Sequence, residues 1–586
     1  MTARMQTFSK HCVAAHNDDV ARAGIEMLER GGNAVDAAVA MAFASGVIDP
    51  VNATLAGSGY MLGVDADGRD PWSVEFPARA PRLARADLFD VVEDAGAGGA
   101  IGVSTVRDRA NAVGPVAGAV PAAVKGLCEA VRARGRLPLA TVLEPAIRHA
   151  RDGFEVDAYY TLFATAARAD LRNNPAAAAV FLQDGTPPLG CFNLSVSGNP
   201  GPRIVQGALA ALLERIAESG PGHLYGGPAG RQLADEVQAA GGLLTTEDLM
   251  RYECRHGRPL RVADGDMELL LPAAPSGAWA VQALVRMWSR LVPAPRDLLD
   301  DEAAAHSAVE AARRAYADRY RFHGDPEHAD VPLDGLLSAD YLAAVASRVG
   351  ARAEVTFGLD GQAPWDYYAR RALHDPWAFS AVSAPPETTP DPESAAGTAS
   401  GTTHFCAVDG DRLTVSCTFT AGEAFGSRFL LEASGLLLDS GMLWFNALPG
   451  FANSIAPWKR PLANMAPLIV RCRDGRVAAL GASGGRRIIS AVAQVARRVA
   501  AQQLGVQEAI DRPRFDASGT QLLVDVRAGA ELLAALAARG HDVAPVDERR
   551  SAFDYEFARP VGVAWRPSGR IEGGVHASMP GIVLGE

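Results

Sequence analysis

The stretch GTTHFCAVDGDRLTVSCTFT, residues 401–420, carries the clearest fold signal in this chain. Residues Thr403–Val408 and Arg412–Phe419 contain several β-branched and aromatic side chains, which favours two strands. Asp409-Gly410-Asp411 lies between them and is typical of a tight turn. These residues therefore predict a β-hairpin.

The hairpin is expected to bring two threonines together. A turn of two or three residues around Gly410 allows three registers, which place Cys417, Thr418 or Phe419 opposite Thr402. Thr418 lies within one residue of Thr402 in each of them. This pairing predicts neighbouring hydroxyl groups, although ordinary β-propensity would also explain two threonines at a strand start.

A nucleophile is one possible role for Thr402. A threonine hydroxyl is a weak nucleophile unless a base lies beside it. Cleavage of the Gly401–Thr402 bond would give Thr402 a free α-amino group with a pKa of about 8. Nucleophile and base would then belong to the same residue.

The segment before this threonine differs from the rest of the chain. Ser383–Gly401 reads SAPPETTPDPESAAGTASG, with four prolines and no large apolar side chain, which predicts a linker or an exposed loop. It is either a tether between domains or a segment that frees its own C-terminal edge to move.

Composition bounds the class of protein. The chain has 586 residues, of which 48% are hydrophobic and 21% charged, so a large folded core is expected. The net charge of −12 argues against nucleic acid or an acidic membrane as a partner. We find no apolar run long enough to span a membrane and no apolar signal segment in residues 1–10, and we expect a soluble cytoplasmic protein. Seven scattered cysteines without a CxxC motif favour reduced thiols and argue against a zinc site.

Helix and strand signals alternate along the chain. Asp18 or Asp19 is expected to cap a helix over Val20–Arg30, and a second helix is expected from Ala34 to about Ser45. Further helices are expected at 302–320, 489–503 and 530–539, and a short strand at 61–65. This pattern favours a layered α/β domain.

An ordered series of motifs covers nearly the whole chain. Its most specific member is Thr402-Thr-His-Phe405, directly after the predicted linker. The others are the helix pair over Ala21–Ala38, Gly57–Leu62, Glu144–Ile147 with Gly153-Phe154, Gly241-Gly242 with Asp248-Leu249, Pro275–Gly277, Ala315–Tyr320 with Gly324–Pro326, Lys459–Leu462 with Met465–Pro467, and Gly481–Ile488. In this series the sequence resembles the γ-glutamyltransferase (γ-glutamyltranspeptidase) family of N-terminal-nucleophile hydrolases.

The resemblance implies a fold and a set of catalytic roles. It implies an αββα sandwich and self-cleavage before Thr402, giving fragments 1–401 and 402–586 that stay together as one intertwined heterodimer. Thr402 would be nucleophile and, through its amine, general base, and Thr418 would hydrogen-bond the nucleophile. Gly484 and Gly485 would supply the backbone N–H groups of the oxyanion hole, and no cofactor or metal is implied.

The predicted acyl pocket departs from the family pattern at the charged positions. Glu75-Phe-Pro-Ala-Arg-Ala-Pro81 has Pro77 where the family places the arginine that holds the substrate α-carboxylate. Arg79, two residues along, is either a substitute on the same strand face or a surface charge. Trp444 stands where the family places the acid that binds the α-amino group, and is either part of the pocket or ordinary packing.

Four more positions belong to the same pocket. Ala463 and Asn464 replace a pair of serines, and Thr420 replaces an asparagine. Glu423, in a loop that is longer than the family's, is a candidate for the missing acid. A buried ammonium or carboxylate without a partner costs several kcal/mol, roughly, so these changes bear on substrate choice.

We therefore expect a self-processing threonine enzyme that hydrolyses or transfers an acyl group, γ-glutamyl or related, from a small-molecule amide. Hydrolysis is favoured over transfer because nothing in the sequence marks an acceptor site. A role in glutathione metabolism is a further expectation. The alternatives are an amidase for another acyl group, such as a small dicarboxylic monoamide or a β-lactam side chain, and a scaffold that no longer cleaves.

Overall fold

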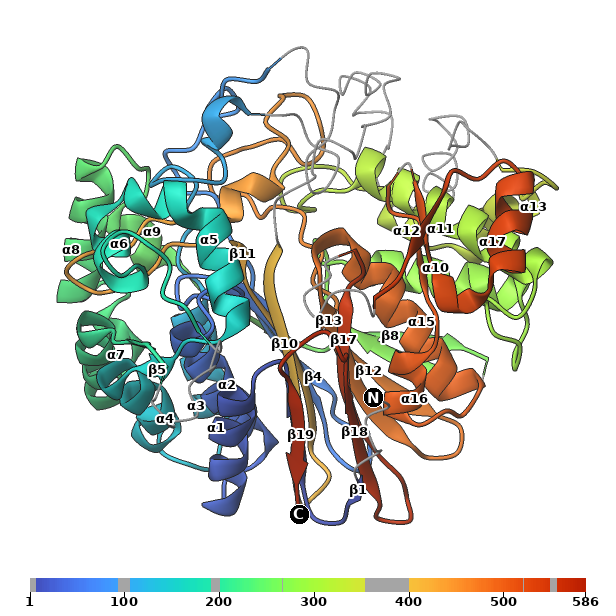
Figure 1. Cartoon of the computed structure of the whole chain (residues 1–586), viewed down its shortest axis with the longest axis horizontal. Helices are drawn as coiled ribbons and strands as arrows, with labels where there is room; N and C mark the ends of the chain where they lie inside the picture. Colours follow the sequence, from blue (N-terminus) through green and yellow to red (C-terminus); the bar gives the residue numbers. More distant parts are fainter. Residues whose placement is uncertain are drawn as a thin grey trace.

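Two seven-stranded sheets form the centre of the molecule, and helices cover the outer face of each (Figure 1). The computed structural model describes residues 7–92, 106–190, 201–265, 267–353, 400–519, 521–548 and 556–586. The predicted linker, Ser383–Gly401, lies outside the described residues except for its last two.

The first sheet carries the predicted hairpin at its centre. Its strand order is β19 (Ile582–Gly585), β2 (Cys12–Ala15), β10 (Ser400–Val408), β11 (Thr414–Glu423), β3 (Ser58–Val64), β4 (Trp72–Phe76) and β7 (Arg255–Gly257). All of these pairs are antiparallel.

The second sheet is antiparallel as well. Its order is β1 (Thr7–Phe8), β18 (Ile571–Val575), β17 (Arg559–Trp565), β13 (Val477–Ser483), β12 (Leu468–Cys472), β9 (Met267–Leu271) and β8 (Leu260–Asp264). The smaller strands are β14 (Phe515–Asp516), β15 (Leu522–Asp525) and β16 (Val543–Val546) in one group, and β5 (Phe154–Glu155) and β6 (Arg203–Ile204) in another. Both large sheets contain strands from before and after Thr402.

The helices form two outer layers (Figure 1). Beside the first sheet lie α1 (Asp18–Glu29), α2 (Ala34–Ile48), α3 (Ala123–Arg134), α4 (Leu139–Asp152), α5 (Ala158–Arg172), α6 (Pro175–Phe181), α7 (Gly207–Ser219), α8 (Pro228–Ala239) and α9 (Thr246–Arg251). Beside the second lie α10 (Ala278–Leu291), α11 (Glu302–Phe322), α12 (Leu333–Leu336), α13 (Ala339–Ser347), α15 (Ile488–Ala501), α16 (Val506–Asp511) and α17 (Ala530–Ala538).

Three apolar clusters separate these four layers. One joins α1 and α2 to the first sheet, and another joins α10, α11 and α15 to the second. The third lies between the sheets and combines Leu62 and Val408 of the first with Ile469 and Val563 of the second. This arrangement confirms the predicted αββα sandwich.

The two sheets approach closely where β10 faces β13. The His404 side chain from β10 is fully buried, and a Cβ atom on Gly481 of β13 would overlap its ring. Glycine at 481 therefore leaves the space that the imidazole fills.

Most predicted elements are present, with local differences at their ends. Asn17, not Asp18 or Asp19, caps α1, because its side chain accepts a hydrogen bond from the Val20 N–H group. The second hairpin strand begins at Thr414 rather than Arg412. None of the helices in the described part of the chain is long and apolar enough to cross a bilayer.

Candidate active site

The register of the hairpin places Thr402 opposite Thr420, so the prediction of Thr418 as its neighbour is wrong. Val408 pairs with Thr414, which leaves a loop of residues 409–413 in place of the predicted shorter turn. The Asp409 carboxylate accepts hydrogen bonds from the N–H groups that follow it in this loop, at 2.9 and 3.1 Å. These bonds close the longer loop, and the longer loop shifts the pairing of the two strands relative to the predicted registers.

Thr420 connects the candidate nucleophile to the bond before it. Its hydroxyl donates to the Gly401 carbonyl oxygen at 2.6 Å and lies 3.0 Å from the Thr402 hydroxyl. It also accepts a hydrogen bond from the Gly422 N–H group at 3.0 Å. Because a hydroxyl has one hydrogen, the Thr402 hydroxyl is the donor to Thr420. Both threonines are buried.

The backbone is irregular at the same bond. The register of β10 on β11 shifts between Gly401 and Thr402. A Cβ atom on Gly401 would overlap the Glu423 carbonyl and lie 2.8 Å from the Val51 carbonyl oxygen. Only glycine therefore fits directly before Thr402 without a shift of the backbone.

Thr418 lies opposite His404 rather than Thr402, and both side chains are buried. Its hydroxyl lies 2.9 Å from His404 Nδ1, and His404 Nε2 lies 3.0 Å from the Cys406 thiol. Burial lowers the pKa of His404 to about 3, so its ring stays neutral near pH 7. The sequence reading did not assign a role to this histidine.

The predicted oxyanion glycines form the turn between β13 and α15. Gly484 and Gly485 have φ angles of +131° and +60°, and both values favour glycine. A Cβ atom on Gly484 would lie 2.7 Å from Ala558 Cα. The 3-10 turn Gly485–Arg487 contacts β10, the strand that carries Thr402. The turn therefore lies beside the strand that carries Thr402.

Arg79 does not continue a strand beside Pro77. Strand β4 ends at Phe76, so the expectation that positions 77 and 79 share a strand face is wrong. The Arg79 guanidinium donates to the Trp458 carbonyl at 2.8 Å, lies over the Trp458 ring and forms an ion pair with Glu327 at 3.4 Å. It is thus engaged by protein groups.

Trp444 lies in an apolar cluster that includes Tyr60, Leu443 and Met465. Its side chain is buried, so it contributes apolar surface at the position where the family pattern predicts an acid. The Tyr60 hydroxyl is buried and has no hydrogen-bond partner among the described residues. Tyr60 pairs with Thr418 on the neighbouring strand, two residues along β11 from Thr420, the partner of Thr402. The sequence reading missed Tyr60, and only an unpaired buried hydroxyl marks it.

Glu423 ends β11 and is already paired. Its carboxylate lies 2.6 Å from a guanidinium nitrogen of Arg109 and 2.6 Å from one of Arg428. Arg109 also contacts Asp170 at 3.1 Å. Two positive charges therefore compensate the acid that the sequence offered as an ammonium ligand, and sequence reasoning identified neither arginine.

Asn464 holds a buried arginine. Its side-chain oxygen accepts from Arg319 at 3.0 Å, and the Ala463 carbonyl accepts from the same guanidinium at 2.7 Å. Burial lowers the pKa of Arg319 to about 10. Arg319 therefore links the Asn464 side chain to the backbone at Ala463.

Comparisons with known proteins agree with this geometry. The gamma-glutamyltranspeptidase family model matches residues 20–568. The chain is 34% identical to the acylase ACY 1 proenzyme of Pseudomonas sp. (strain V22) over 544 residues, which cover 92% of this chain and 88% of that one. It is 30% identical to the glutathione hydrolase proenzyme of Escherichia coli (strain K12) over 550 residues, covering 91% and 85%.

A solved structure supports the fold. Cephalosporin acylase from Bacillus halodurans superposes with a TM-score of 0.80 at 20% identity, over 100% of this chain and 97% of that one. With the family match over nearly the whole chain, the chain belongs to the gamma-glutamyltranspeptidase family, whose self-processing enzymes hydrolyse or transfer an acyl group.

Proposed function

We propose that this enzyme cuts itself between Gly401 and Thr402 and then hydrolyses a small amide whose acyl group lacks a free α-amino group. The contact of the Thr420 hydroxyl with both Thr402 and the Gly401 carbonyl carries the proposal.

Self-cleavage starts from the hydroxyl of Thr402. Its oxygen attacks the Gly401 carbonyl carbon; a C–O bond forms, the C–N bond breaks, and the hydroxyl proton passes to the Thr402 nitrogen. Negative charge develops on the Gly401 oxygen, to which Thr420 already donates. Water then hydrolyses the ester and releases the Gly401 carboxylate and the Thr402 hydroxyl.

The new α-amine makes Thr402 a complete catalytic unit. The amine takes the hydroxyl proton as the oxygen attacks the substrate carbonyl, and the acyl group forms an ester on Thr402. The N–H groups of Gly484 and Gly485 stabilise the oxyanion, the amine protonates the leaving group, and water releases the acid. Fragments 1–401 and 402–586 remain a heterodimer, because each sheet pairs strands of both.

The charges around the pocket favour an acyl group without an ammonium. Trp444 is apolar, and Glu423 is occupied by Arg109 and Arg428. Burial raises the pKa of Tyr60, so its hydroxyl stays a neutral donor for an acyl oxygen. The two relatives are named an acylase and a glutathione hydrolase, and these names correspond to the two kinds of acyl group considered for this enzyme.

The test compares a glutaryl anilide with a γ-glutamyl anilide, which differs by the amine alone. A missing charge-assisted partner costs about 1.5–3 kcal/mol, so kcat/KM should favour the glutaryl substrate by roughly 10-fold to 100-fold. A denaturing gel run first must show two fragments; a single uncut chain would support the scaffold alternative. A strong preference for γ-glutamyl would refute the acyl-group proposal and favour a glutathione hydrolase.

Matched variants locate the recognition. Glu423→Gln should leave the glutaryl preference intact, because its carboxylate serves Arg109 and Arg428. Tyr60→Phe removes only the unpaired hydroxyl and should raise KM for the glutaryl anilide. The cytoplasmic location and the preference for hydrolysis over transfer remain part of the proposal.

A further inference from the structure

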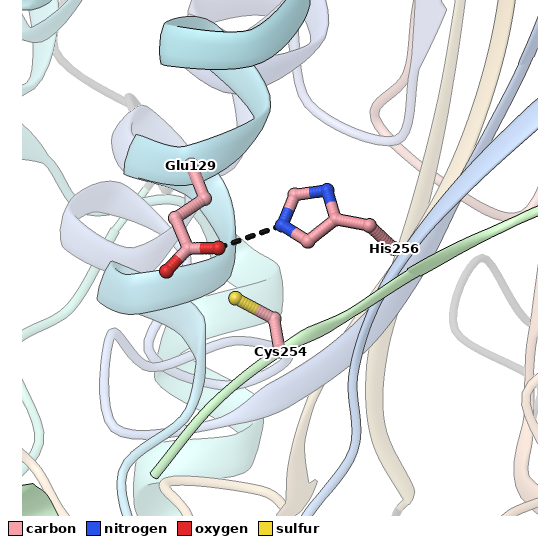
Figure 2. Close-up of side chains that lie close together, drawn as sticks. All are labelled: Glu129, Cys254 and His256. Carbon is pink, nitrogen blue, oxygen red and sulfur yellow. Dashed lines mark hydrogen bonds and ion pairs between the residues drawn. The ribbon is translucent and has the colours of Figure 1, made fainter.

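Three possible metal ligands meet at the free edge of the first sheet, away from the catalytic threonines. Strand β7 is the last strand of that sheet, and three strands, β11, β3 and β4, separate it from β10. Cys254 lies directly before β7 and His256 within it, two residues apart, so their side chains leave the same face. Glu129 projects from α3 toward them (Figure 2).

The packing of α3 on the sheet explains why these side chains meet. His256 pairs with Val74 of β4, and Val74 lies in the apolar cluster that also contains Leu127 of α3. Gly126 of α3 rests on the Phe76 ring, since a Cβ atom there would overlap it. The helix therefore lies against this face of the sheet, with Glu129 above β7.

The geometry of the three groups suits one small cation. One ligand atom from each of Glu129, Cys254 and His256 lies within 4.8 Å of both others. Glu129 Oε2 and His256 Nε2 are 2.6 Å apart and share a hydrogen bond (Figure 2). Two tetrahedral zinc ligands with bonds of about 2.0 Å lie roughly 3.3 Å apart, so a shift of under about 1 Å would admit the ion.

We propose that Glu129, Cys254 and His256 form a zinc site with its fourth position open to solvent. A thiolate, an imidazole and a carboxylate are the ligand types that zinc takes, and the mixture with sulfur disfavours magnesium and calcium. The side chains of His256 and Glu129 are 40% and 19% exposed, which leaves a path for the ion. Binding replaces the Glu129–His256 hydrogen bond by two metal bonds: the proton on His256 Nε2 moves through water to Nδ1, which frees the Nε2 lone pair, and the Cys254 thiol proton is released to water.

Spacing along the chain could not reveal this site. The seven cysteines are scattered and form no CxxC pair, and from this the sequence argued against a zinc site. The third ligand, Glu129, comes from helix α3, more than a hundred residues before Cys254 and His256. Only the packing of α3 on the sheet adds it.

One neighbouring charge opposes the ion. Lys125 lies one helical turn before Glu129, and its ammonium is 3.8 Å from Glu129 Oε1. The repulsion weakens binding without removing a ligand. Lys125→Met should therefore bind zinc more tightly than the wild-type enzyme, which a simple hydrogen-bonded Glu–His pair would not predict.

The experiment titrates zinc into the self-cleaved enzyme after treatment with a chelator. We expect one saturable zinc per chain and a melting temperature that rises with zinc concentration. Cobalt in its place should give thiolate-to-metal absorption. Cys254→Ser and His256→Ala should each weaken zinc binding by about 10-fold or more, while amide hydrolysis without zinc stays unchanged.

A matched thiol provides the control. Cys472 is a half-buried free cysteine like Cys254, but lies at the end of β12 in the other sheet. Cys472→Ser should bind zinc as the wild type does. Absence of saturable zinc binding, absence of thiolate-to-cobalt absorption, or equal affinity in Cys254→Ser and the wild type would each overturn the proposal.

Discussion

Replacement of Thr420 by valine removes a hydroxyl and leaves the shape of the side chain almost unchanged. The wild-type hydroxyl makes three contacts: it donates to the Gly401 carbonyl at 2.6 Å, receives the Thr402 hydroxyl at 3.0 Å and receives the Gly422 N–H group at 3.0 Å. All three disappear in Thr420→Val.

The expected loss in self-cleavage follows from the first contact. Removal of one donor to a developing oxyanion lowers a rate by about 10²-fold to 10³-fold. The Gly401 carbonyl and the Gly422 N–H group also lose a buried partner, which costs about 1–3 kcal/mol each in unfolding free energy. The variant should therefore fold with reduced stability and cut itself slowly.

Cell-free synthesis followed by a denaturing gel measures the first-order rate of fragment release. Thr418→Val is the matched control, because its hydroxyl lies 2.9 Å from His404 Nδ1 and opposite that residue rather than Thr402. We expect Thr418→Val to lose comparable stability and to cleave at close to the wild-type rate. Thr420→Ser should cleave faster than Thr420→Val, since it retains a hydroxyl.

The reverse ranking would refute the reasoning. If Thr418→Val stopped cleavage and Thr420→Val did not, the relevant partner of Thr402 would be Thr418 and the register would not govern the reaction. Circular dichroism of both variants separates a slow reaction from a failure to fold.

Four other predictions follow from named contacts. Thr402→Ala should remain one chain by intact mass, whereas Thr402→Ser should cleave in part. Gly484→Ala should lower kcat by roughly 10²-fold or more, because its φ of +131° and the 2.7 Å approach to Ala558 Cα forbid a side chain. Burial lowers the pKa of folded His404 to about 3, so below pH 6.5 the unfolded state binds a proton that the folded state does not. The unfolding free energy should therefore fall as pH falls from 6.5 toward 3. In urea titrations, His404→Gln should reduce this slope by up to about 1.4 kcal/mol per pH unit. Burial raises the pKa of Asp439 to about 7, so its contribution to stability is lost as pH rises from about 4 to 7, and urea titration should show Asp439→Asn to be more stable than the wild type at pH 8.

Local sequence determined the elements of this protein. The β-branched residues near Thr402 predicted a hairpin. The helix at 18–29 follows from its apolar spacing, and the helix at 34–48 from an Ala-rich apolar run that is buried on every side. The order of motifs implied the αββα sandwich. The hairpin and the helices depend on neighbours within a few residues, which a single sequence displays directly, whereas the sandwich was implied by the resemblance to a known family.

Tertiary structure alone decided which side chains meet. The Asp409 carboxylate closes a loop of residues 409–413, which is longer than the predicted turn of two or three residues. This longer loop places Thr420 rather than Thr418 beside Thr402. Strand β4 stops before Pro77, so the position of Arg79 could not be read from alternation along a strand.

Contacts between distant segments were equally invisible along the chain. Arg109 reaches Glu423 across more than three hundred residues, and Glu129 reaches His256 across more than a hundred. The physical reason is that a register or a helix–sheet contact depends on the closure of every intervening loop and on the packing of whole layers, whereas propensity and periodicity act only over neighbouring residues.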